Sequence, residues 1–137
     1  MPEEIRVPIK TDPDLVAARR AGREVARELG FSSTDQTLIA TAISEIARNI
    51  VQHALGGEVT VTPVIEPGRK GVVIVATDVG PGIPDLELAL REGYSTTGKG
   101  LGLGLPGARR LVEEFQVTSE VGKGTTVVMK KWVGSGG

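Results

Sequence analysis

Hydrophobic positions along the chain follow two spacings, one typical of strands and one typical of helices. Residues 5–9 alternate between apolar and polar side chains, which predicts a short half-buried strand, and Pro8 within it favours the edge of a sheet. From residue 12 to residue 29, apolar and small residues recur at helical spacing, which predicts a helix. We expect Asp12 to cap this helix, with proline at its first position, and Gly30 to end it.

The most regular hydrophobic pattern belongs to a second predicted helix. Ser32 and the polar residues after it can cap its beginning, and the chain is expected to leave the helix near Gly56. Its apolar positions form one stripe, as in a helix that packs one face against a core. They are Leu38, Ile39, Ala42, Ile43, Ile46, Ala47, Ile50 and Val51.

The rest of the chain alternates between β-rich runs and glycine-rich turns. The first predicted elements are a hairpin of strands over residues 58–65 and 71–77 and a break over 78–84. A helical stretch over 85–91 and a glycine-rich loop over 93–104 follow. The last elements are a third main helix over 106–115 and strands over 116–119 and 125–133. Together the elements predict one α/β (α+β) domain over residues 1–133, a two-layer sandwich in which about three main helices cover a mixed, mostly antiparallel sheet. Residues 134–137 are expected to form a flexible tail.

Composition narrows the class of protein and of ligand. The net charge is −1 and aromatic residues make up only 3%, which argues against nucleic acid as a ligand. The absence of cysteine excludes disulfides and thiolate metal sites, and a single histidine excludes a multi-histidine metal site. No apolar run approaches the ~20 residues of a membrane-spanning helix. Charged residues also interrupt the N-terminus, so we expect a cytoplasmic protein with no membrane partner.

A row of polar residues on the second helix is the first candidate for chemistry. Thr41, Glu45, Asn49 and His53 are each four residues apart, so they form one slowly turning ridge beside the apolar stripe. Glu45 and Asn49 lie one turn apart and can share a ligand, the carboxylate as a base and the amide oxygen on a hard cation such as Mg²⁺. A solvated polar face explains the same pattern, and His53 suits a structural place near the helix end.

Three glycine-containing segments are the other candidates. Asp78, followed by Gly80 and Gly82, comes directly after a strand, where the glycines let backbone approach a flat ligand closely. The segment 98–104 alternates glycine with other residues and leads into a helix, an arrangement that favours phosphate. The segment 122–125 is explained by a tight hairpin alone, and the other two segments are equally compatible with ordinary turns and loops.

The order of these segments resembles the GHKL ATPase superfamily. A helix with Glu45 and Asn49, then Asp78-x-Gly80-x-Gly82, then a glycine-rich loop before a helix, then Gly122-x-Gly124-Thr125, are similar to the N, G1, G2 and G3 boxes of the Bergerat nucleotide fold. Within the superfamily, the segments 44–49, 80–85 and 104–107 look most like the small bacterial anti-sigma and switch serine-protein kinases, and in particular the stressosome kinase of the sigma-B pathway.

This resemblance implies ATP and Mg²⁺ as cofactors and a role for each matched residue. Glu45 would be the general base, Asn49 would bind Mg²⁺, and Thr125 would support the base through hydrogen bonding. Asp78 would recognise adenine above Gly80 and Gly82. The phosphate cradle and lid would comprise Gly98, Lys99, Gly100, Leu101, Gly102, Leu103 and Gly104.

The resemblance also implies a function, a protein serine/threonine kinase of a partner-switching stress response. Such a kinase phosphorylates a STAS-domain antagonist or scaffold and, once released, activates a PP2C-type phosphatase. Two alternatives stay open: an anti-sigma factor that binds a sigma subunit directly, and a nucleotide-dependent interaction module without significant phosphotransfer. A homodimer is compatible with the pattern but is not required by it.

Arginines on the first helix form a last candidate surface. Arg19, Arg20 and Arg23 fall on its exposed positions, where they could dock a partner protein or simply face water. If they dock a partner, charge reversal at Arg20 should weaken phosphorylation of that partner without changing the affinity for ATP.

Overall fold

A computed structural model describes residues 3–80 and 105–134. The predicted helical stretch over 85–91, the glycine-rich loop over 93–104 and most of the predicted tail lie outside these residues. In the described ranges the elements are β1 (Ile5–Ile9), α1 (Asp12–Leu29), α2 (Ser33–His53), β2 (Gly57–Glu66), β3 (Arg69–Asp78), α4 (Leu105–Arg110), β4 (Glu114–Glu120) and β5 (Gly124–Trp132). No helix among them is long and apolar enough to cross a membrane.

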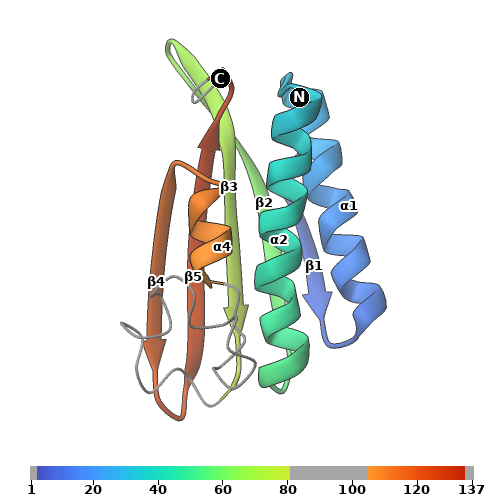
Figure 1. Ribbon diagram of the computed structural model, residues 1–137, viewed down its shortest axis with the longest axis vertical. Helices are drawn as coiled ribbons and strands as arrows, with labels where there is room; N and C mark the ends of the chain where they lie inside the picture. Colours follow the sequence, from blue (N-terminus) through green and yellow to red (C-terminus); the bar gives the residue numbers. More distant parts are fainter. Residues whose placement is uncertain (1–2, 81–104, 135–137) are drawn as a thin grey trace.

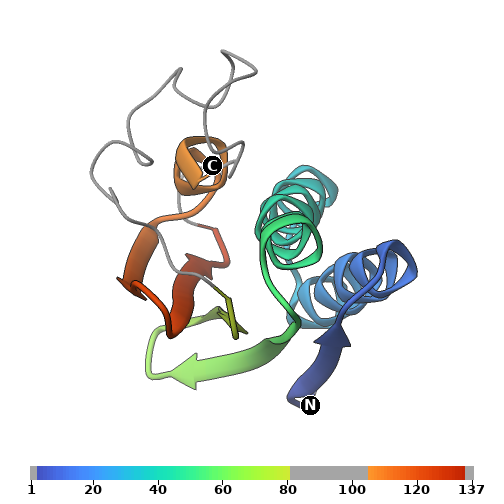
Figure 2. The same cartoon turned by 90° about the horizontal axis from the view of Figure 1, so that it is seen from below.

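The described strands form a five-stranded sheet in the order β1-β2-β3-β5-β4, and every pair of neighbours is antiparallel. The predicted strand with Pro8 is confirmed as β1 at one edge, where a residue without a backbone donor is tolerated. All three described helices cover one face of the sheet, and the end-on view separates the two layers (Figures 1 and 2). The predicted two-layer α+β fold is therefore confirmed.

The first helix begins one residue earlier than its sequence signals indicated. The N-cap is Thr11 rather than Asp12, and the proline occupies the second helical position. The reason is a carboxylate three residues into the helix: Asp14 Oδ2 accepts hydrogen bonds from the backbone nitrogens of Thr11 (3.0 Å) and Lys10 (2.8 Å). The predicted end is confirmed, because Gly30 adopts a left-handed conformation with φ 93°.

The second helix supplies the centre of the core. Ser32 caps it by accepting a hydrogen bond from the backbone of Asp35 (3.1 Å). Its apolar stripe packs between α1 and the sheet, with Ile39, Ile43 and Ile50 almost fully buried. A Cβ atom at Gly22 of α1 would lie inside the contact distance of the Ile43 side chain, so the absence of a side chain there lets the two helices approach closely.

Two predicted elements have the wrong length. The helix expected over residues 106–115 ends at Arg110, and β4 already begins at Glu114. Tertiary pairing overrides the helical pattern, because Phe115 pairs with Met129 of β5 and packs against the core. The hairpin turn is also shorter than predicted: Glu66 pairs with Arg69 across two residues, and Gly68 takes the positive φ (84°) that this tight turn requires.

Candidate nucleotide site

The end of the central strand, the end of α2 and the turn between β4 and β5 meet at one end of the molecule (Figure 1). Two backbone hydrogen bonds hold the first two together: Leu55 N donates to Val79 O (2.9 Å), and Val79 N donates to Gly56 O (2.9 Å). The chain leaving β3 is thereby fixed beside the chain leaving α2. The candidate residues on these elements are far apart in sequence but are brought to one place.

Asp78 ends the central strand β3 with a half-buried carboxylate. Its Oδ1 accepts a hydrogen bond from Thr125 N (3.1 Å), the second residue of β5. Burial raises the pKa of Asp78, and the Thr125 amide opposes that rise by stabilising the charged form. A carboxylate fixed at the rim of the sheet with one oxygen engaged can accept a hydrogen bond from a ligand amino group through the other oxygen.

Three glycines surround Asp78, and each occupies a place where a side chain would collide. A Cβ atom at Gly124 or at Gly57 would lie closer than 3.0 Å to backbone atoms of Thr77 or Asp78. A Cβ atom at Gly80 would meet Ala54 at 2.9 Å. Gly57 is absent from the predicted site; its sequence signal was a glycine pair that also marks the end of α2, so local reasoning assigned it to the turn.

Thr125 is tied to Asp78 rather than placed freely in the site. Its backbone nitrogen donates to Asp78, and its Oγ1 lies 2.9 Å from Ser119 Oγ on β4. Among the described residues, Thr125 forms no hydrogen bond with Glu45. The expected support of Glu45 by Thr125 therefore stays a prediction, whereas the observed contact makes Thr125 a positioning residue for Asp78.

The polar ridge of α2 changes its exposure along the helix. Thr41 is exposed and donates its hydroxyl to Thr37 O (2.9 Å), whereas Glu45 and Asn49 are half-buried. The Glu45 carboxylate lies 3.3 Å from Arg48 Nη1. Asn49 Oδ1 is buried and has no hydrogen-bond partner among the described residues. The side chain of His53 lies outside the described atoms.

The unpartnered Oδ1 of Asn49 bears on whether this part of α2 fits Mg²⁺. A buried amide oxygen without a partner costs free energy unless a donor or a cation meets it, and hard cations accept amide oxygens as ligands. The described residues contain no group of three His, Cys, Asp or Glu side chains that could hold a metal on their own. The buried Oδ1 of Asn49 is therefore an oxygen donor that fits a hard cation such as Mg²⁺.

The remaining predicted site residues lie outside the described part of the chain. They are Gly82, Gly98, Lys99, Gly100, Leu101, Gly102, Leu103 and Gly104. The described site thus comprises the base candidate, the cation candidate and the adenine candidate with its surrounding glycines.

Comparison with known proteins agrees with this arrangement. Residues 34–133 match the family described as histidine kinase-, DNA gyrase B-, and HSP90-like ATPase. The matched segment includes α2 with Glu45 and Asn49, the central strand with Asp78, and β5 with Thr125. The chain belongs to this ATPase family.

Individual proteins are similar to this chain over most of its length. The chain is 49% identical to serine/threonine-protein kinase RsbT of Bacillus subtilis over 97% of its own length and 99% of the relative. It is 38% identical to an anti-sigma F factor of Geobacillus stearothermophilus over 76% of the chain and 74% of the relative. An anti-sigma F factor of Clostridium acetobutylicum is 33% identical over 73% and 76% of the two chains.

Membership of the ATPase family implies that the chain uses ATP. Asp78 offers an acceptor at the end of the sheet, the surrounding glycines let the neighbouring backbone pack closely around it, and α2 carries an amide oxygen and a carboxylate one turn apart.

Proposed function

We propose that this chain is an ATP-dependent serine/threonine-protein kinase of a bacterial partner-switching stress response. The observation that carries the proposal is the 49% identity to serine/threonine-protein kinase RsbT, which extends over nearly the whole length of both chains. The enzyme class predicted from the sequence, a protein serine/threonine kinase, is the class named for that relative. Residues 1–133 are proposed to form one kinase domain.

The described residues support a direct phosphoryl transfer. The hydroxyl oxygen of the acceptor protein attacks the terminal phosphorus of ATP, the bond to the bridging oxygen breaks, and ADP leaves. Glu45 accepts the hydroxyl proton, since it is a half-buried carboxylate on the ridge of α2. Asp78 orients ATP through adenine, and Thr125 holds Asp78. Asn49 would hold Mg²⁺, which would neutralise charge on the phosphates when bound.

The acceptor is proposed to be a STAS-domain antagonist or scaffold protein of a stressosome. The released kinase is proposed to activate a PP2C-type phosphatase, and both events would take place in the cytoplasm. These assignments rest on the sequence resemblance together with the relationship to RsbT. A homodimer is compatible with the proposal but is not needed for the transfer step.

An anti-sigma factor is the second candidate function. The observation that favours it is the identity of 38% to an anti-sigma F factor over about three-quarters of each chain. In that case the chain binds a sigma subunit directly and phosphorylates the antagonist of that complex. Copurification of a sigma subunit with the tagged chain distinguishes the two candidates.

Substitution of the base tests whether the chain transfers phosphate. We expect Glu45→Ala to lower transfer from ATP to a STAS-domain acceptor at least 100-fold, because general-base catalysis contributes about that much. The affinity for ATP, measured by isothermal titration, should change less than twofold. Glu28→Ala on α1 is the control, because it removes an exposed carboxylate far from the ridge. Full transfer by Glu45→Ala would exclude Glu45 as the base, and nucleotide binding without any transfer by the wild type would favour an interaction module.

A further inference from the structure

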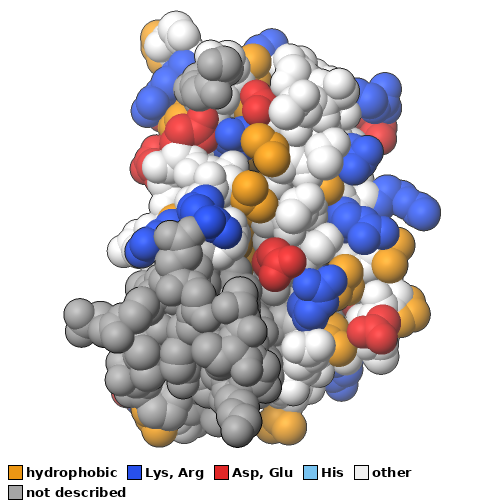
Figure 3. All heavy atoms as spheres, in the orientation of Figure 1, with side chains coloured by type: hydrophobic (Ala, Val, Ile, Leu, Met, Phe, Trp, Pro, Cys, Tyr) orange, Lys and Arg blue, Asp and Glu red, His pale blue; other side chains and the backbone are white. Residues whose placement is uncertain are grey.

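A groove between α1 and α2 carries three arginines that the ATP site does not use. It encloses about 440 Å³ and is lined by Val16, Arg19, Arg20, Arg23, Ala40 and Thr41. The space-filling view shows Lys and Arg side chains gathered over this side of the molecule (Figure 3). The groove therefore has an apolar floor and a basic rim.

The arginines of this groove have no ion pair with the described residues. Arg19, Arg20 and Arg23 are exposed and form no hydrogen bond or ion pair there. Arg27, one turn further along α1, is paired with Glu24. Unpaired guanidinium groups side by side repel one another unless an anion lies between them, so the groove favours a negatively charged occupant.

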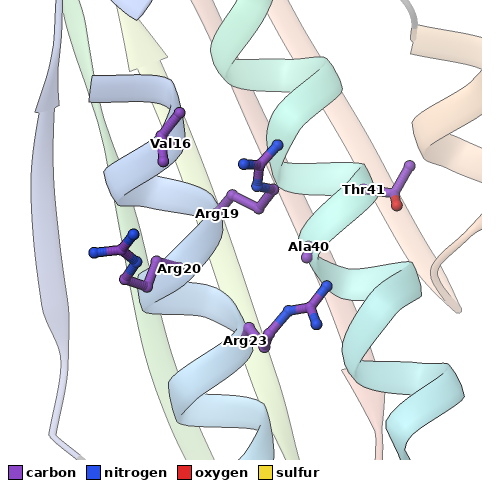
Figure 4. A pocket seen from close by; sticks show the side chains of 6 residues that line it. All are labelled: Val16, Arg19, Arg20, Arg23, Ala40 and Thr41. Carbon is purple, nitrogen blue, oxygen red and sulfur yellow. The ribbon is translucent and has the colours of Figure 1, made fainter. Parts of the chain in front are cut away.

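The directions of the side chains distinguish the three arginines. Arg19 and Arg23 extend from α1 toward α2 on either side of Ala40, whereas Arg20 points away from α2 (Figure 4). Arg19 and Arg23 are four residues apart, so their Cα atoms are separated by about 6 Å along the helix axis. Two carboxylates one turn apart on a facing helix have the same spacing.

We propose that this groove binds an acidic helical segment of the protein that accepts the phosphoryl group, a proposal that rests on the kinase function above. Carboxylates one turn apart pair with Arg19 and Arg23, and apolar side chains of the segment cover Val16, which is 39% exposed, and Ala40. Arg20 also lines the groove, but its side chain points away from α2, so it contributes less to binding than Arg19 and Arg23.

The position of the groove on α2 connects it with the reaction. Thr41 lies on the side of α2 turned away from α1 (Figure 4), one turn before Glu45 on the polar ridge. Because Thr41 also lines the groove, a segment that crosses α2 from Ala40 to Thr41 ends about one turn of helix from the base. This is why the occupant is the acceptor itself, whose hydroxyl must reach Glu45.

A labelled peptide tests the chemistry of the groove without any phosphoryl transfer. The probe is a fluorescein-labelled helical peptide with glutamates four residues apart on one face and leucines beside them, measured by fluorescence anisotropy. The double variant Arg19→Gln/Arg23→Gln should weaken binding about tenfold or more, since it removes two charge-assisted contacts. Arg20→Gln should weaken it less than threefold, and the control Arg27→Gln should leave it unchanged. All four arginines are exposed, so thermal unfolding should be nearly unaffected.

Several results would overturn this assignment. Equal binding of the peptide with glutamine in place of glutamate would exclude recognition of charge. An equal loss in Arg27→Gln would show nonspecific attraction. Displacement of the peptide by millimolar inorganic phosphate would show a small-anion site. Self-association of the wild type in sedimentation velocity that is lost in the double variant would identify a second copy as the occupant.

Transfer kinetics with a STAS-domain acceptor test the source of the segment. The double variant should raise KM for the acceptor about tenfold, with kcat and the affinity for ATP unchanged, because the arginines bind the acceptor and not the reacting atoms. An unchanged KM would exclude the acceptor as the occupant. If the wild type phosphorylates no acceptor, the proposed function fails, and the peptide titration alone decides whether the groove binds acidic helices.

Discussion

Asp78 combines a proposed role in ATP binding with a cost to folding. Its carboxylate is half-buried at the end of β3, and burial raises its pKa because the charged form loses hydration. An acid whose pKa is raised in the folded state makes the protein less stable once the pH rises through that pKa. Asp14 behaves in the opposite way, because backbone N–H groups of Lys10 and Thr11 lower its pKa.

We predict that Asp78→Asn stabilises the protein at neutral pH while weakening ATP binding at least tenfold. The amide removes the cost of a buried charge. It has one acceptor oxygen instead of two, so with that oxygen bonded to Thr125 N it loses the second acceptor that a ligand amino group would use. The gain in Tm over the wild type should shrink as the pH falls through the raised pKa. Thermal unfolding between pH 3 and pH 8, together with isothermal titration of ATP, measures both effects.

Asp14→Asn is the control, because the pKa of Asp14 is shifted in the opposite direction to that of Asp78. It should lower Tm at neutral pH, and its difference from the wild type should vanish as the pH falls through the lowered pKa. Its affinity for ATP should not change, since its hydrogen bonds go to Lys10 and Thr11 and to none of the candidate site residues. A loss of Tm in Asp78→Asn at pH 7 would contradict the assigned cost of its charge.

Asn49 gives a second prediction at the scale of a single residue. Because its buried Oδ1 has no partner among the described residues, Asn49→Leu should leave Tm unchanged or raise it. The increase in ATP affinity that Mg²⁺ causes in the wild type should be lost. Titrations of ATP with Mg²⁺ and with EDTA measure this difference. Retention of the full Mg²⁺ effect would exclude Asn49 as a ligand of the cation.

The turn between β4 and β5 shows how an element depends on a neighbour that is distant in sequence. Gly122 and Gly124 both have positive φ, 84° and 129°. A Cβ atom at Gly122 would meet nothing, whereas one at Gly124 would collide with the carbonyl of Asp78. The first glycine is required by the turn alone, and the second by the turn and by its contact with β3.

We therefore predict different costs for two matched substitutions in this turn. Gly122→Ala should lower the free energy of unfolding by about 1 kcal/mol, the cost of a left-handed conformation. Gly124→Ala should lower it by roughly 2–4 kcal/mol, because strain and a backbone collision add. It should also weaken ATP binding by displacing Asp78. Urea unfolding of both variants measures the difference, and equal losses would contradict the close approach to Asp78.

The two layers of the molecule are joined by a buried charge. Lys131 of β5 is 7% exposed, and its Nζ lies 3.8 Å from Asp35 of α2 and 3.8 Å from Glu113, which precedes β4. The lysine thus connects the sheet with the first turn of α2 and with the connection between α4 and β4. Its neighbour Lys130 is more exposed and lies near Glu114 (3.9 Å).

We predict that Lys131→Met lowers the free energy of unfolding by about 2–4 kcal/mol, because it leaves the poorly hydrated carboxylate of Asp35 without its cation. Lys130→Met is the matched control and should cost at most about 1 kcal/mol, as expected for an exposed pair. Urea unfolding of both variants tests this. An equal effect of the two substitutions would mean that the buried charge does not hold the layers together.

Most elements, and the order of the site segments, could be predicted from the sequence. The period of apolar residues in α1 and α2, the proline of the edge strand and the glycine after α1 are local signals, and local geometry determines what they do. The order of Glu45, Asn49, Asp78 and the later glycines likewise sufficed to indicate the ATPase family, which the match over residues 34–133 confirms. Each of these signals can be recognised from residues that are close together in the sequence or from their order along it.

Only the tertiary structure decided which of these residues act on one another. Phe115 joined a strand rather than a helix because it pairs with Met129. Gly57 and Gly124 became part of the site because both lie against the end of β3, and Arg19 rather than Arg20 extends toward α2 because of where α2 packs. Each outcome depends on contacts between segments far apart in sequence, which no local pattern of side chains records.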